Sequence, residues 1–164
     1  MNAAALLALV VLLAACSAAR IESGVFHSPK GYAVTLPGGG WRVAPRGEAD
    51  LELRRDAPPG GMLADATCEG GERGRPLPVL ARHLTFGLTQ RVTLESETRV
   101  LGGRPAARSV VRGVLDGAEV EVEAVVLRSG RCIHDFLYVA PVEQFEAGRR
   151  DFQTLVESLS ETAP

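Results

Sequence analysis

The most regular alternation of apolar and polar residues runs from position 104 to position 140. Asp116-Gly117 separates two runs rich in β-branched residues, and both positions tolerate the positive φ of a two-residue hairpin turn. A second turn at Ser129-Gly130 leads into a further strand, and the extended run 92–101 precedes the first. The pattern therefore predicts a four-stranded antiparallel meander.

The hairpin register places small and branched side chains on one face of this meander, which suits it to packing under a helix. These residues are Ala107, Ser109, Val111, Leu115, Val120, Val122, Ala124 and Val126. The opposite face carries the charged residues Arg108, Arg112, Glu119, Glu121 and Glu123. We expect these charges to form cross-strand pairs in contact with solvent.

The last strand of the meander, 131–140, is apolar on both of its faces. Ile133, Leu137 and Val139 point one way, and Cys132, Phe136 and Tyr138 point the other. This is typical of a central strand that is covered on both faces.

Four shorter strands are expected before the meander, at 31–36, 41–43, 50–55 and 62–68, with a loop at 57–61. Two apolar stripes have helical spacing. The first is Leu77, Leu80, Ala81, Leu84 and Leu88, which predicts a helix over 77–88 that begins after Pro76. The second is Phe145, Gly148, Phe152, Leu155, Val156 and Leu159, which predicts a closing helix with Arg149, Arg150, Gln153 and Glu157 facing outward. Two helices and roughly seven strands predict one α+β domain, 30–160, with an antiparallel β-sheet covered by helices.

The N-terminal segment indicates export. Residues 3–15 are all Ala, Leu or Val, a run of signal-peptide length that is too short to span a bilayer comfortably. Leu13-Ala14-Ala15-Cys16 resembles the bacterial lipobox, which predicts a signal peptide at 1–15, a lipidated Cys16 and a tether at 16–29. The absence of Asp at Ser17 resembles the signal for an outer-membrane destination. The alternative is an ordinary cleaved secretory signal with an incidental cysteine.

Charge and cysteine content limit the class of partner and the role of the cysteines. With 18 basic and 20 acidic residues the chain is nearly neutral, which argues against a nucleic-acid partner. Cys68 and Cys132 remain as a pair in an oxidising compartment, which predicts a structural disulfide. A redox-active pair is the alternative, although no Cys-x-x-Cys spacing supports it.

Acid–base chemistry is sparse. His134 and Asp135 are adjacent, but successive strand residues point to opposite faces, so they cannot act together on one substrate atom. Asp135 falls on the face of Ser109 and Ala124, where it would cap a helix or turn or take part in binding. The three histidines have no carboxylate or cysteine at ligand spacing, so we expect no metal site and no cofactor.

The order of these features resembles the PsbP and DcrB-like superfamily, in particular its small bacterial envelope lipoproteins. The resemblance rests on the strand that ends at Leu36-Pro37-Gly38 and is followed by Trp41, the helix at 77–88, the turn glycine before Pro105-Ala106, the Asp116-Gly117 hairpin and the last helix. It implies an α/β/α sandwich and a role in protein association without catalysis.

The first functional hypothesis is therefore a lipid-tethered binding or accessory protein, not an enzyme. It would dock on an envelope protein complex from the periplasmic side, or hold a small apolar ligand, through an exposed patch at 38–41 around Trp41 or at 57–61. The alternative is a periplasmic enzyme, either a hydrolase or a thiol oxidoreductase, that uses Asp135, His134 or Cys68.

Overall fold

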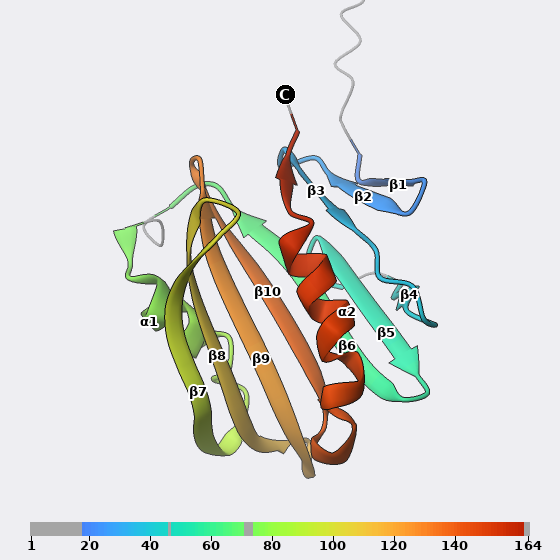
Figure 1. The fold of residues 1–164 in the computed structure, drawn as a ribbon, viewed down its shortest axis with the longest axis vertical. Helices are drawn as coiled ribbons and strands as arrows, with labels where there is room; N and C mark the ends of the chain where they lie inside the picture. The colour runs from blue at the N-terminus through green and yellow to red at the C-terminus, as the bar shows by residue number, and fades with distance from the viewer. Residues whose placement is uncertain (1–17, 46, 71–73, 163–164) are drawn as a thin grey trace, which may run out of the picture.

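The computed structural model describes residues 18–45, 47–70 and 74–162, which form two antiparallel sheets and two α-helices (Figure 1). The strands are β1 (Arg20–Glu22), β2 (Val25–Ser28), β3 (Tyr32–Thr35), β4 (Arg42–Val43), β5 (Leu51–Asp56), β6 (Pro59–Thr67), β7 (Thr89–Leu101), β8 (Arg104–Leu115), β9 (Ala118–Ser129), β10 (Cys132–Pro141) and β11 (Ser160–Glu161). The helices are α1 (Leu77–His83) and α2 (Glu146–Glu157), with a short 3-10 helix, η2 (Val142–Gln144), before α2. Within the described residues, no helix is long and apolar enough to cross a membrane.

The large sheet has the strand order β4-β5-β6-β10-β9-β8-β7. Its last four strands are the predicted meander, and Leu115 lies opposite Ala118 as the Asp116-Gly117 turn requires. In the second hairpin Ser129 lies opposite Cys132, so the loop is one residue later than predicted. Each residue of β10 is therefore paired two positions away from its predicted partner on β9. Because side chains alternate with a period of two along a strand, every side chain stays on its predicted face.

The small sheet has the order β1-β2-β3-β11 and contains both ends of the described chain. Residues 20–28 form β1 and β2, so the predicted tether is wrong over this range. Ser23 and Gly24 adopt positive φ values of 50° and 77° and turn the chain back on itself. The fold of this hairpin is stabilised by Phe26, which is buried and lies 6.3 Å from the ring of Tyr32.

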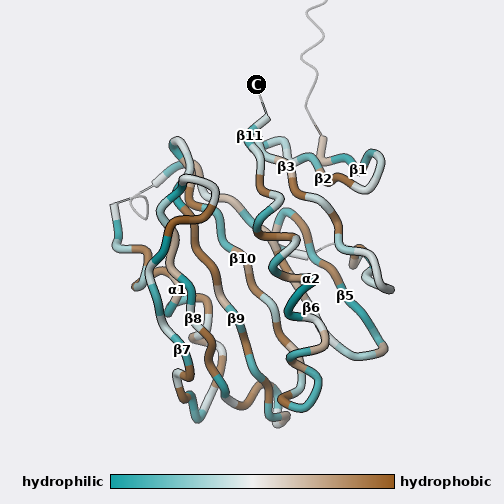
Figure 2. The backbone as a smooth tube through the Cα atoms, in the orientation of Figure 1, coloured by the Kyte–Doolittle hydropathy of each residue, from teal (hydrophilic) through white to brown (hydrophobic). Residues whose placement is uncertain are grey.

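The helices cover the large sheet less completely than a sandwich would require. The small sheet and α2 pack on one face around Phe136, Tyr138 and Phe152, whereas α1 packs on the other face (Figure 1). Because α1 lies mainly over β8 and β9 and does not cover the later part of β10, Leu137 and Val139 are half-buried. The expectation of a central strand covered on both faces is therefore wrong at these two residues. In Figure 2 apolar stretches follow β8, β9 and β10, whereas β7 and α2 are mixed.

The two predicted helices are present and most of their apolar residues are buried, but the residues at which the helices begin and end differ from the prediction. The second stripe is confirmed, because Phe145, Phe152 and Leu155 are almost fully buried. The first helix ends at His83, not at position 88, and the chain continues in turns whose N–H groups bond three residues back, as in Thr85 to the Arg82 carbonyl oxygen at 3.2 Å. The loop expected at 57–61 is confined to its first residues, since Pro59 pairs with Asp56 and begins β6.

Charged residues expected in solvent lie beneath α2. Arg108 and Glu123 are 5% and 1% exposed and form an ion pair, which corrects the prediction of a solvated charged face. Arg149, expected to face outward, bends onto the sheet and contacts Glu123 at 3.1 Å and Glu95 at 3.1 Å. The hydrogen bond from Arg108 lowers the pKa of the Glu95 carboxyl. This network fixes α2 to β7, β8 and β9.

Candidate functional site

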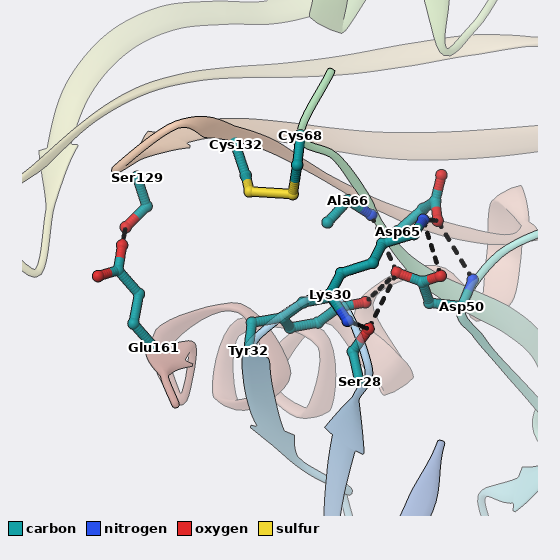
Figure 3. The surroundings of a disulfide bond; sticks show 10 residues. All are labelled: Ser28, Lys30, Tyr32, Asp50, Asp65, Ala66, Cys68, Ser129, Cys132 and Glu161. Atoms are coloured by element: carbon teal, nitrogen blue, oxygen red, sulfur yellow. Dashed lines mark hydrogen bonds and ion pairs between the residues drawn. A yellow bond between two sulfur atoms is a disulfide. The ribbon is translucent and has the colours of Figure 1, made fainter. Parts of the chain in front are cut away.

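Cys68 and Cys132 form a disulfide between the end of β6 and the start of β10, as predicted (Figure 3). A cleft of about 550 Å³ opens beside it, with Lys30, Cys68 and Arg131 in its lining. The disulfide thus links the ends of two neighbouring strands of the large sheet, β6 and β10.

The polar network beside this cleft is internally satisfied. The Lys30 Nζ lies 2.8 Å from Asp50 and 2.9 Å from Asp65, and the Tyr32 hydroxyl donates to Asp50 at 2.9 Å (Figure 3). Burial opposes the charge on Lys30, but the hydrogen bonds and charges of Asp50 and Asp65 raise its pKa overall. Burial raises the pKa of Tyr32 as well, followed by the charge of Asp50. The Lys30 ammonium group thus occupies the position between the Asp50 and Asp65 carboxylates that a bound cation would take. In the described parts of the chain, no three His, Cys, Asp or Glu residues are grouped to hold a metal.

Trp41 lies against the α2 side of the large sheet and is half-buried. Its indole N–H donates to Asp151 at 2.8 Å, the Arg55 guanidinium lies 4.4 Å above its ring, and its ring stands edge-on to Tyr138 at 6.2 Å. The ring face and the N–H are both engaged within the fold. A role for Trp41 in binding remains a prediction.

His134 and Asp135 occupy opposite faces of β10, as strand geometry requires. His134 is 3% exposed and stands edge-on to Tyr32 at 5.1 Å. Burial lowers its pKa to about 4. Asp135 is half-buried on the α1 side, opposite Val126 in the ladder. Since Trp41 lies on the α2 side, the structure does not bring the two predicted binding residues together.

The candidate site is a groove of about 470 Å³ on the α1 side of the sheet, between α1 and the strands β7 and β8. It exists because the short helix α1 ends at His83 and packs mainly on β8 and β9, so that it touches β7 at few residues and leaves most of that strand uncovered. Apolar side chains line its inner part, namely Val79, Ala81, Ala107 and Val111. We call this the α1–β7 groove.

Hydroxyl and guanidinium groups supply the polar chemistry of the α1–β7 groove. Ser96 and Ser109 are cross-strand partners in its lining, and the buried Ser109 Oγ has no hydrogen-bond partner within the described residues. Arg82 and Arg91 are exposed at its rim. Across residues 18–45, 47–70 and 74–162, neither guanidinium lies within ion-pair distance of a carboxylate.

This arrangement favours binding over proton transfer. The titratable side chains in the lining are Arg82, Arg91, Glu97 and Arg108, and Glu97 is paired with Arg108 at 3.4 Å. A serine needs an adjacent base to become a nucleophile, and this lining offers Ser109 none. Two guanidinium groups, four hydroxyls and an apolar floor suit an anionic partner that also has apolar groups.

Sequence reasoning missed the α1–β7 groove. Arg82 and Arg91 are ordinary solvent-facing residues in their local patterns. The one available signal is the extended run 92–101, which has polar residues on both faces and so indicates an uncovered edge strand.

No protein-family model and no curated protein match this sequence. Several solved structures share the fold, among them the three that follow. PsbP of the cyanobacterium Synechocystis (CyanoP) has a TM-score of 0.62 and 14% identity, covering 91% of this chain and 98% of its own. LpqN of Mycobacterium tuberculosis, described as involved in cell envelope biogenesis, has a TM-score of 0.60 and 15% identity, covering 80% of this chain and 83% of its own. A Bacteroides thetaiotaomicron protein has a TM-score of 0.62 and 11% identity over 87% of this chain, which spans only 50% of that protein. The predicted resemblance to PsbP is thus confirmed at the level of the fold.

Proposed function

We propose that this chain is a membrane-anchored bacterial envelope lipoprotein with a non-catalytic accessory role, docking on an envelope protein complex at the periplasmic side of the outer membrane. The observation that carries the proposal is the α1–β7 groove, in which two exposed guanidinium groups stand beside an uncovered edge strand. The fold shared with PsbP and with an envelope-biogenesis protein supports the same conclusion by analogy.

The position of the small sheet suits a lipid anchor. Cys16 lies outside the described residues, and β1 begins at Arg20. Four residues span at most about 14 Å, so an anchor at Cys16 would hold the small sheet close to the lipid surface. The strand β7 forms the far edge of the large sheet, and its first part lies away from the small sheet and would remain accessible to a partner (Figure 1).

The test is mild crosslinking in cells of the tagged full chain, followed by mass spectrometry, with Cys16→Ser as the control. Recovery of one envelope complex, lost when the anchor is lost, is the expected result. Recovery of nothing above the Cys16→Ser control would contradict docking.

A carrier of a small ligand is the second candidate, because a volume of about 470 Å³ lies in the usual range for small-molecule sites. A ligand screen on the folded protein tests it. For the enzyme alternative, activity that disappears in Asp135→Asn would favour a hydrolase over both binding roles.

A further inference from the structure

The outer edge of β7 is a free edge of the large sheet. β7 is 13 residues long and pairs only with β8, so the backbone groups along its outer side have no strand beside them in the described structure. Residues 89–98 are exposed on both faces of the strand. Edge strands of this length are normally protected, because their unpaired N–H and C=O groups accept another strand.

Irregular pairing, one of the devices that protect an edge strand, is confined to the first part of β7. The ladder between β7 and β8 is irregular between Thr89 and Val92 and between Thr93 and Glu95. From Glu95 to Leu101 the ladder is regular, which leaves an edge without a bulge. The part that is easiest to extend is therefore 95–101.

Exposed apolar side chains gather along the same edge. Of seven large hydrophobic residues exposed in the described structure, four lie on β7 or in the turn before it. These are Phe86 at 55%, Val92 at 57%, Leu94 at 45% and Val100 at 69% exposure. A concentration of this kind on one edge indicates an interaction surface.

The charge of this surface selects the partner. Arg82 and Arg91 lie on the α1 side without an ion-pair partner in the described residues, and Arg91 stacks 5.0 Å above the Phe86 ring. The carboxylates of β7, Glu95 and Glu97, are bound to Arg108 at 2.6 Å and 3.4 Å. The groove face is therefore positive.

We propose that an extended, acidic segment of an envelope protein adds to the free edge of β7 at 95–101 and continues across the mouth of the α1–β7 groove. Its backbone pairs with β7, its apolar side chains cover Val100 and Phe86, and its carboxylates bind Arg82 and Arg91. This inference rests on the proposed docking function and names its surface and the chemistry of its partner.

The test is site-specific photo-crosslinking of the full chain in cells. A photoreactive phenylalanine analogue replaces Val100 or Phe86, and in matched controls it replaces Val43 or Ile21, which are 46% and 48% exposed on β4 and β1. Each of these four replacements is combined with Arg82→Glu and Arg91→Glu, or with the control pair Arg54→Glu and Arg150→Glu, all at exposed arginines. Mass spectrometry identifies the crosslinked peptide.

The expected result is one partner captured from both Val100 and Phe86, through an acidic segment, and not from Val43 or Ile21. The groove charge reversals should reduce its yield about tenfold or more, since like charges across an interface are strongly unfavourable. The control pair should leave the yield unchanged.

Three outcomes would overturn the inference: capture of a second copy of this chain, a yield insensitive to the groove charges, or no adduct from Val100 and Phe86. If Val43 or Ile21 instead captures an envelope protein, docking stands and only its surface is wrong. If no position captures a partner and the Cys16→Ser comparison is also negative, the proposed function itself fails.

Discussion

Arg108 on β8 and Glu123 on β9 are diagonal neighbours in the sheet and are buried as an ion pair beneath α2. The second oxygen of Glu123 accepts from Arg149 on α2 at 3.1 Å, and Arg108 also contacts Glu95 on β7 at 2.6 Å. One carboxylate thus connects the helix to two strands. Removing it would leave two buried or half-buried guanidinium groups without their main partner.

Glu123→Gln is therefore expected to lower the free energy of unfolding by about 3 kcal/mol, because it breaks a buried pair and leaves a charge behind. Urea titration measures the change. Glu121→Gln is the matched control: its partner Arg112 has a side chain that is 49% exposed, so the expected loss is below about 1 kcal/mol. Equal losses in the two variants would contradict a special role for the buried network.

The disulfide closes a sequence separation of 64 residues. In the chain-entropy model a loop of this size stabilises the folded state by roughly 4 kcal/mol, through restriction of the unfolded chain. We expect reductant to lower the urea midpoint of the wild-type protein by a corresponding amount. A Cys68→Ala, Cys132→Ala protein should already have the lower midpoint and should not respond to reductant. A response in that variant would show that the effect lies elsewhere.

His134 is expected to make the fold sensitive to mild acid. Its pKa is lowered by burial from 6.5 to about 4, so the unfolded state binds the proton more readily. Stability is therefore full above pH 6.5 and decreases as the pH falls toward 4, by roughly 3 kcal/mol from this residue. The charged groups that act on it are Glu161, Arg104, Asp50 and Asp65.

His134→Phe keeps a ring of similar shape and removes the titration. Unfolding free energies measured from pH 7 to pH 4 should fall less steeply in this variant than in the wild-type protein. Parallel curves would show that the imidazole does not control the acid sensitivity.

Gly148 lies where α2 approaches Tyr138 and Arg55 of the large sheet closely. A Cβ atom there would stand 2.8 Å from Tyr138 Cζ and 3.0 Å from Arg55 Nη2. Gly148→Ala should therefore destabilise the protein by about 1–3 kcal/mol through overpacking. Gly87→Ala is the matched control, because a Cβ at Gly87 meets nothing within 4 Å. A neutral Gly148→Ala would indicate that α2 can move away from Tyr138 without loss.

Features set by local sequence were predictable. The Asp116-Gly117 turn determines the register of its hairpin, and the stripe through Phe145 and Phe152 determines the buried face of α2. The disulfide followed from counting cysteines in an oxidising compartment. The hairpin and the helix face each depend on a few neighbouring residues. The disulfide depends only on Cys68 and Cys132 being the two cysteines left for pairing once Cys16 is assigned to the lipid.

Features that depend on crossing elements were not predictable. Arg108 and Glu123 alternate along their strands as solvent-facing residues would, and only the path of α2 buries them. The α1–β7 groove arises because a helix of seven residues packs beside a strand of 13 residues and leaves part of it uncovered. This difference in length cannot be seen from the sequence of either segment alone. The extent of helical cover over a sheet is a tertiary property.

The small sheet holds both β1 and β11, so both ends of the described chain leave from the same side of the molecule. Tension applied at the N-terminal end would therefore first separate β1 from β2, one residue pair after another. The strand β7 lies at the far edge of the other sheet and would not share that force (Figure 1). A domain pulled by its anchor would thus yield at its small hairpin while the shape of its opposite edge is preserved.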